Sequence, residues 1–291
     1  MYSEMCSAAR IPQENRQHSA YFRWRDEEAG RLVMQIVGAD AQRMTKAACR
    51  IEAEGLFGVD INLGCSVKEI CKYNQGAALL KDPDAVLSMV AAIRGAISCP
   101  LTVKYRTGWQ DDPRPAVDLA RRLEDVGVDA LIFHPRVAPD RRTRPPKWEY
   151  IGLVKEAVSI PVFGNGNVFD AEDCLNMFLQ TGCDGVALGR MAIARPWIFA
   201  QWSRAGGSIS NDYLKGSLRL LQLLGQHYDP VTALRRFRQY ATYLAANFSF
   251  GNTLFNGIRS ATDADEVEEI LFDFFDSRPR ELLRPNMNFL R

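Results

Sequence analysis

The sequence predicts an α/β fold of the TIM-type (β/α)8 barrel class, with seven strands visible, followed by a C-terminal α-helical domain. Short apolar runs alternate with longer helical patterns up to about residue 200. The runs are apolar on both faces, which is typical of parallel strands covered by helices. Polar residues end nearly every run, and this even distribution favours a barrel with one mouth over an open doubly wound sheet. They are Glu4, Gln35, Asn62, Lys104, His134, Asn165 and Arg190.

The strand-like runs read YSEMCS, LVMQIVG, GVDINLG, LTVKYRTG, ALIFHPR, PVFGNGN and GVALGR. The helical patterns between them carry end signals. Asp82 and Pro83 are suited to the N-cap and first turn of one helix. Gly55, Gly127 and Gly182 are suited to close three others. Repeated β-then-α units of this kind predict a parallel sheet with right-handed crossovers.

The pattern changes after residue 202. The segment AGGS indicates a linker, and the rest reads as helices without a convincing strand. We therefore expect a barrel domain over residues 1–202 and a helical domain over residues 203–291. Residues 203–260 hold seven Lys or Arg against two Asp or Glu, and residues 261–291 hold four against eight. The charge of the helical domain is thus divided along the chain.

Composition excludes several classes of protein. No run of 18 apolar residues is present, so no membrane span is expected. The N-terminal segment lacks the basic and apolar regions of a signal peptide. The seven cysteines form no C-x-x-C pair and the three histidines are dispersed, so we expect neither a metal site nor a disulfide framework. These features fit a protein of the reducing cytoplasm.

Glycine-containing loops follow the last two predicted strands, in VFGNGNVFD and GVALGRMAIARPW. In barrels of this class the corresponding loops bind phosphate through backbone N–H groups and the N-terminus of a short helix. Arg190 could add a charge-assisted hydrogen bond. The alternative is a simple tight turn and a surface arginine. Because the two loops lie at adjacent strand ends, we favour a phosphate site.

Lys104 and Gln35 lie inside apolar strands, where a lysine is costly unless it has a partner. At the mouth of a barrel they could hold the pyrimidine edge of a flavin, where negative charge accumulates on reduction. Alternatively, Lys104 only extends its ammonium to solvent. His134 also ends a strand, and it is equally suited to a structural role and to a ligand contact.

Cys65 follows a strand end in INLGCSVKEI. Buried cysteines are usually inert packing residues. A thiol at the end of a barrel strand could instead act as a general acid or a nucleophile. Cys71 is expected in the following loop, away from the strand end.

Four segments in the same order resemble the tRNA-dihydrouridine synthases: DINLGCSVKEICKYNQGAALLKDP, LTVKYRTGW, IPVFGNGNV and GVALGRMAIARPWIF. The resemblance covers residues 2–200 strongly and the helical tail more weakly. It implies an FMN-containing barrel followed by a helical tRNA-binding domain. Such enzymes reduce the C5–C6 double bond of particular uridines in tRNA and use NADPH to reduce the flavin. We expect a cytoplasmic monomer that binds tRNA.

The resemblance also implies roles for individual residues. Cys65 matches the general acid that protonates C5 after hydride reaches C6, and Asn62 matches a residue near the target uracil. The positions that match flavin contacts are Gln35, Lys104, His134, Asn165, Gly166, Asn167, Gly189 and Arg190. In the helical domain, Arg235 and Arg238 lie away from the apolar face of a predicted helix. They belong either to a solvated face or to a contact with RNA phosphates.

The sequence departs from the family at several points. Ser66 replaces a usual proline, and Asn167 replaces a usual aspartate. The segment FHPRVAP lacks the glycine and arginine pattern that usually follows the histidine. The family's first strand has no visible counterpart, so we expect a gap between the first and last strands, weak FMN binding, and a gene model that begins at an internal methionine. Two other functions stay open: an FMN-barrel oxidoreductase for a small pyrimidine-like molecule, and a truncated, non-catalytic RNA-binding relative.

Overall fold

The computed structural model describes residues 1–138, 140, 144–202 and 212–290, and the chain forms two compact units. The first unit comprises Met1–Asn167 and Cys174–Ala187, and the second comprises Val168–Asp173 and Leu188–Arg291. The predicted AGGS linker lies outside the described residues. The division into domains at residues 202 and 203 therefore stays a prediction.

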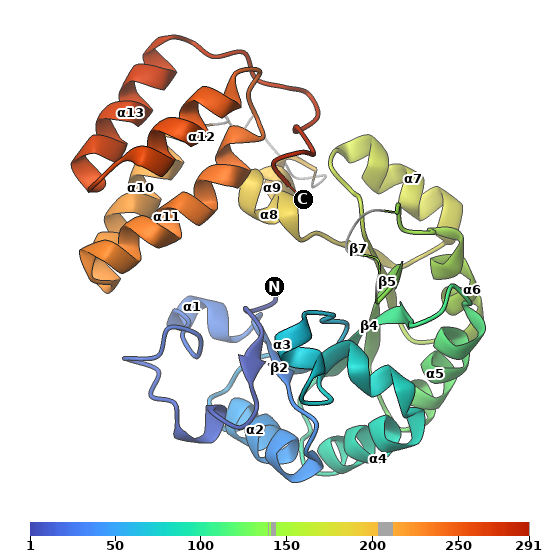
Figure 1. Cartoon of the computed structure of the whole chain (residues 1–291). Coiled ribbons are helices and arrows are strands. Elements are labelled where there is room, and N and C mark those ends of the chain that lie inside the picture. The colour runs from blue at the N-terminus through green and yellow to red at the C-terminus, as the bar shows by residue number, and fades with distance from the viewer. Residues whose placement is uncertain (139, 141–143, 203–211, 291) are drawn as a thin grey trace. The chain divides into compact units, whose positions relative to one another are not determined.

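The first unit contains one parallel sheet of seven strands, which pair in the order of the chain (Figure 1). The strands are β1 (Cys6–Ser7), β2 (Val33–Val37), β3 (Gly58–Leu63), β4 (Leu101–Gly108), β5 (Ala130–Val137), β6 (Val162–Asn165) and β7 (Gly185–Ala187). Within the described residues no ladder joins β1 to β7, so both are edges of the sheet. Seven parallel strands that alternate with helices confirm the predicted fold class.

Helices alternate with these strands along the chain. They are α1 (Asp26–Ala29), α2 (Ala41–Ala53), α3 (Lys68–Cys71), α4 (Pro83–Arg94), α5 (Arg114–Asp125), α6 (Glu149–Ala157) and α7 (Ala171–Thr181), with the 3-10 helices η1 (Ile11–Gln13) and η2 (Gly76–Lys81). The Asp82 side chain accepts from the Ala85 N–H, and Pro83 begins α4, as predicted. Gly55, Gly127 and Gly182 follow their helices with positive φ, as expected of helix-terminating glycines.

Apolar residues on both faces of the strands form the core of this unit. In β5, for example, the consecutive residues Leu131, Ile132 and Phe133 are all buried. The flanking helices bury apolar faces, such as Met44 and Ile51 of α2. Among the described polar residues of this unit, Asp60 of β3 is the most deeply buried, with no exposed surface. A buried carboxyl is costly unless it is hydrogen-bonded.

The second unit is helical. Its helices are α8 (Arg190–Ala194), α9 (Ile198–Gln201), α10 (Tyr213–His227), α11 (Pro230–Ala245), α12 (Gly251–Ser260) and α13 (Ala264–Asp276). The apolar face predicted for the α11 segment is confirmed, because its members are buried together in the core of this unit. They are Leu234, Phe237, Ala241, Leu244 and Phe248.

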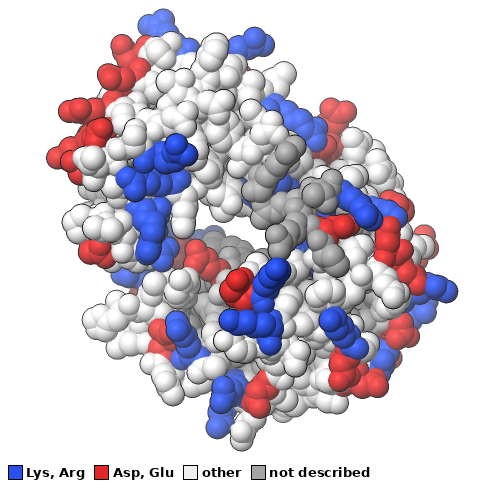
Figure 2. Space-filling view, viewed as in Figure 1, with Lys and Arg blue, Asp and Glu red and all other residues white. Residues whose placement is uncertain are grey.

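The charge of the second unit is divided in space as it is along the sequence. Acidic side chains gather along the edge where Figure 1 places α13, and basic side chains lie over α10 and α11 (Figure 2). Among the residues that the structure describes, no helix combines the length and the apolar character that a membrane span requires.

Candidate active site

Polar side chains occur in five neighbouring strands of the first unit, in the middle of some strands and in the carboxyl-terminal part of others. They are Gln35 of β2, Asn62 of β3, Lys104 of β4, His134 of β5 and Asn165 of β6. Each is partly exposed, whereas most residues of these strands are buried. Because the strands are parallel and pair in order, these side chains belong to one edge of the sheet, where barrel enzymes build their sites.

A continuous chain of hydrogen bonds joins β4 to the segment that carries Cys65. The Thr102 hydroxyl donates to Asp60 Oδ1 over 2.6 Å, and Gln35 Nε2 donates to Asp60 Oδ2 over 2.6 Å. Asn62 Nδ2 then donates to Gln35 Oε1 over 2.8 Å. Asn62 Oδ1 accepts from the Cys65 N–H over 2.9 Å and from the Gly64 N–H over 3.0 Å.

Further hydrogen bonds hold the backbone around Cys65. The Arg106 guanidinium donates from Nε to the carbonyl of Gly64, and the Ala77 N–H donates to the carbonyl of Cys65 over 2.8 Å. Gly76 packs against that same carbonyl: a Cβ at position 76 would lie 2.5 Å from the Cys65 oxygen. The Cys65 thiol is half-buried. The structure therefore presents this thiol from a fixed backbone at the end of β3.

Cys71 does not lie in a loop as predicted. It ends the short helix α3, and its thiol donates to the Cys65 carbonyl over 3.5 Å. Burial raises the pKa of the Cys71 thiol. Cys71 therefore supports the backbone of the Cys65 segment.

Lys104 and Asn165 form a second polar pair. Lys104 Nζ donates to Asn165 Oδ1 over 3.0 Å, and Asn165 Nδ2 donates to the Ala187 carbonyl over 2.7 Å. Loss of solvent lowers the pKa of Lys104 to about 8, and the nearby Asp60 charge opposes this shift. Asn62 of β3 is the register partner of Lys104. The ammonium therefore stands beside the hydrogen-bonded chain that leads to Cys65.

His134 and Gly166 are in close contact. Gly166 has a φ of +122°, and a Cβ at this position would lie 2.9 Å from His134 Nε2. Only glycine combines this backbone conformation with so close an approach to the imidazole. The neighbouring Asn167 also has a positive φ, of +55°. The predicted site residues of this loop thus adopt a turn that brings the backbone against the histidine.

Sequence analysis missed two residues of this arrangement, Asp60 and Arg106. Burial raises the pKa of the Asp60 carboxyl to about 7, although the hydrogen bonds from Thr102 and Gln35 oppose the shift. The available signals were an aspartate inside the apolar run GVDINL and an arginine two residues after Lys104.

Gly189 and Arg190 belong to the second unit, at the start of α8. Arg190 Nη1 donates to the Leu290 carbonyl over 2.9 Å, and the guanidinium lies 5.0 Å from the centre of the Phe169 ring. The segment MAIARPWIF contributes to two short helices, α8 and α9. A phosphate site built from the two glycine-containing loops stays a prediction.

The two arginines assigned to RNA occupy different environments on α11. Arg235 is exposed, whereas Arg238 is half-buried and its Nη2 donates to the Ala261 carbonyl over 2.5 Å. Between them in sequence, the Arg236 guanidinium lies 4.4 Å from the centre of the Tyr228 ring. Arg235 therefore offers the more accessible cation, and both RNA contacts stay predictions.

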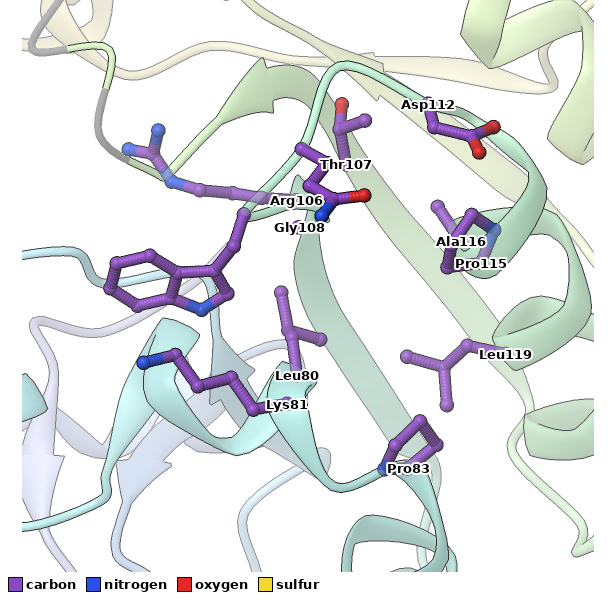
Figure 3. A pocket seen from close by; sticks show the side chains of 12 residues that line it. Leu80, Lys81, Pro83, Arg106, Thr107, Gly108, Asp112, Pro115, Ala116 and Leu119 are labelled. Atoms are coloured by element: carbon purple, nitrogen blue, oxygen red, sulfur yellow. The ribbon is translucent and has the colours of Figure 1, made fainter.

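A cavity of about 200 Å3 adjoins the end of β4 (Figure 3). Its apolar lining includes Leu80, Pro83 and Leu119, and Arg106 connects it with the Cys65 segment. The Lys81 ammonium lies 4.2 Å from the centre of the Trp109 ring, whose indole N–H donates to the Ala77 carbonyl. No group of three or more His, Cys, Asp or Glu suited to a metal ion occurs in the described parts of the chain.

A parallel α/β sheet with a cysteine, amides and a lysine at its strand ends has the organisation of a barrel enzyme with one site at the carboxyl face. The family model described as dihydrouridine synthase matches residues 1–275. The chain belongs to the dihydrouridine synthase family, and the resemblance seen in the sequence is confirmed.

Curated relatives agree with this assignment. The chain is 34% identical to the tRNA-dihydrouridine synthase B of Escherichia coli (strain K12) over 261 residues, which cover 86% of this chain and 81% of that protein. It is 31% identical to a tRNA-dihydrouridine(16) synthase of Neisseria meningitidis serogroup B over 250 residues, covering 83% and 75%. With the tRNA-dihydrouridine synthase B of Pseudomonas syringae pv. tomato it shares 40% identity over 168 residues, or 58% of this chain and 50% of the relative. The chain thus spans about half the length of that relative.

Proposed function

We propose that this protein reduces uridines in tRNA to 5,6-dihydrouridine, with FMN as cofactor and NADPH as electron donor. Family membership supports the reaction class. The observation that carries the proposal is the Cys65 segment, which hydrogen bonds hold at the end of β3 beside Asn62. When bound, FMN supplies the hydride that uracil C6 receives.

The residues at the strand ends fit a flavin. Of the three N–H groups of the Lys104 ammonium, one donates to Asn165, and in the described part of the chain no other acceptor occupies the remaining two. With a pKa of about 8, Lys104 keeps its charge at neutral pH. It can therefore hold the pyrimidine edge of the flavin, where negative charge accumulates on reduction. Gln35 adds an amide to the same edge.

The turn after β6 carries further residues that the resemblance assigns to the flavin, namely Asn165, Gly166 and Asn167. The positive φ of Gly166 brings its backbone against the imidazole of His134, which the resemblance also assigns to the flavin. By the same resemblance, Gly189 and Arg190 are phosphate contacts.

Cys65 supplies the proton in this proposal. Reduction of uracil at C6 leaves negative charge at C5 and its conjugated carbonyl, and in its thiol form Cys65 donates a proton to C5. The Cys65 backbone is fixed by Asn62, Ala77 and Arg106, so the thiol stays in position for this transfer. Asn62 would contact the uracil itself.

The partner of the protein is a tRNA, and the target uridine has to leave its stack to reach the strand ends. The helical second unit would hold the RNA backbone through basic side chains on α11, Arg235 and Arg238 among them. We place this activity in the cytoplasm, which accords with seven cysteines that are all free thiols. We further propose that the protein acts as a monomer.

The experiment that tests the function maps dihydrouridine in the tRNA of cells that lack this gene. We expect one or more dihydrouridines to revert to uridine, and the purified full chain to restore them in that tRNA with FMN and NADPH. An unchanged modification pattern together with no activity of the purified chain would contradict the proposal. Preferential reduction of a free pyrimidine would indicate a small-molecule oxidoreductase instead.

A further inference from the structure

We propose that Asp60 is a positioning residue, which fixes the amide orientations of Gln35 and Asn62 and, through them, the backbone of Cys65. The role of this network in catalysis rests on the proposed function, whereas its geometry does not. Asp60 lies inside the sheet and its side chain does not reach Cys65 directly. It acts through two intervening amides.

At the carboxylate end of the hydrogen-bonded chain, Asp60 determines which amide group of Gln35 faces it. In its ionised form the Asp60 carboxylate can only accept hydrogen bonds, so the Gln35 group that then faces Asp60 Oδ2 at 2.6 Å is the NH2 group. The carbonyl oxygen of Gln35 is thereby turned toward Asn62. That oxygen requires a donor, which Asn62 Nδ2 supplies at 2.8 Å.

At the Cys65 end, the backbone independently determines the same orientation of the two amide groups. The backbone N–H groups of Gly64 and Cys65 can only donate, so the Asn62 atom that faces both has to be Oδ1. Asn62 Nδ2 then has to face Gln35. The two ends of the chain impose one consistent orientation on two amides, either of which could otherwise rotate by 180°.

The burial of Asp60 indicates that the carboxyl serves this purpose. Asp60 is fully buried in a strand whose other core positions are apolar, and an apolar side chain would avoid the cost of burying a carboxyl. Among the described residues, its oxygens accept from Thr102 and Gln35 only. Thr102 on β4 and Gln35 on β2 are its register partners. The bond to Gln35 continues through Asn62 to the backbone of Cys65.

Three variants of the full chain separate positioning from simple packing. Asp60→Ala removes the acceptor for Gln35. Asp60→Asn keeps an acceptor for Gln35, because its NH2 group can donate to the Thr102 hydroxyl, which also accepts. Thr102→Val is the matched control, since it perturbs an equally buried position of the neighbouring strand and leaves the bond between Asp60 and Gln35 in place.

The first measurement is hydrogen exchange at the backbone amides of Gly64 and Cys65, without cofactor or RNA. We expect Asp60→Ala to exchange at least about fivefold faster than wild type at both amides, as loss of a cooperative hydrogen bond implies. Asp60→Asn and Thr102→Val should stay within about twofold. Equal acceleration in all three variants, or none in Asp60→Ala, would overturn the proposal.

The second measurement is the turnover of dihydrouridine formation with saturating FMN and NADPH. Asp60→Ala should lose about tenfold or more, because displacement of reacting groups by about 1 Å is costly, and Asp60→Asn should recover most of the loss. If the wild-type chain forms no dihydrouridine, the proposed function fails while the exchange measurement still decides the positioning. If Asp60→Ala does not fold, Gln35→Met interrupts the chain one residue later and should accelerate the same two amides.

Discussion

Asp60 in the first unit and Asn247 in the second are both fully buried polar residues, yet their hydrogen bonds lead to different places. Asp60 connects through Gln35 and Asn62 to a half-buried thiol at the end of a strand. Asn247 donates to the carbonyls of Ala194, Tyr243 and Leu244, and its Oδ1 accepts from Arg195 Nε over 2.7 Å.

Asp60 and Asn247 differ in the kind of group to which their hydrogen bonds lead. The Asn247 bonds end on backbone carbonyls of α8 and α11, and so they tie these two helices of the second unit together. One Asp60 bond ends on the buried Thr102, and the other leads to Gln35 and Asn62, which are partly exposed and which the family resemblance assigns to the site. We therefore propose that burial of a polar residue serves stability in the second unit and the placement of site residues in the first.

The largest effect is expected at Cys65. Cys65→Ala should reduce uridine reduction by about 10²–10⁴-fold, the usual contribution of a general acid, while FMN binding and NADPH oxidation without tRNA continue. The measurement is single-turnover formation of dihydrouridine. Cys71→Ala is the matched control, because that thiol contacts the Cys65 carbonyl through a weak hydrogen bond, and it should keep turnover within about threefold. Wild-type turnover of Cys65→Ala would rule out the assigned role.

Asn247→Ala tests the other half of the comparison. It should destabilise the protein by about 3 kcal/mol, because several buried carbonyls and the Arg195 guanidinium lose partners. Denaturant unfolding measures the change. Below the unfolding temperature, NADPH oxidation should be unchanged. A loss of activity without a loss of stability would contradict a purely structural role for Asn247.

The pH dependence of the free energy of unfolding tests the raised pKa of the Asp60 carboxyl. Folding raises the pKa of this carboxyl to about 7, from an ordinary value of about 4. Between these values the folded chain holds a proton that the unfolded chain releases, so stability falls as pH rises. Asp60→Asn lacks this titration and should gain about 2 kcal/mol on wild type between pH 5 and pH 8. Denaturant unfolding at several pH values measures it, and a constant difference would contradict the raised pKa.

The smallest effect is expected on α11. Arg235→Ala should weaken tRNA binding by about threefold and reduce the salt slope by about one, because an exposed cation that contacts phosphate releases counterions. Arg238→Ala should have a smaller effect on tRNA binding and should also lower the unfolding temperature, since its guanidinium is bound to the Ala261 carbonyl. Binding titrations at several salt concentrations separate the two. An unchanged slope in Arg235→Ala would place the RNA path elsewhere.

Periodicity and end signals were sufficient for much of the fold. β4 has the bounds of the predicted run, Leu101–Gly108, and Asp82 caps α4 as expected. Such features depend on neighbours within a few residues, which the sequence displays directly. The short helix α3 was not predicted, because four residues without a capping side chain or an apolar period carry no local signal. Contacts such as that of the Ala77 N–H with the Cys65 carbonyl hold this segment instead.

By itself the sequence determined the parallel strands, the apolar face of α11, and the polar positions Gln35, Asn62 and Lys104 within strands, with Cys65 just after a strand, although Gln35 and Lys104 lie in the middle of their strands and not at the predicted ends. Only the tertiary structure decided which of these polar groups bond to one another, and it added Asp60 to them. Gln35 and Asp60 are 25 residues apart in sequence, and the register of β2 on β3 makes them partners. A one-residue change of register would turn each side chain to the other face. Hydrogen bonds between side chains of different strands therefore depend on packing that no local pattern records.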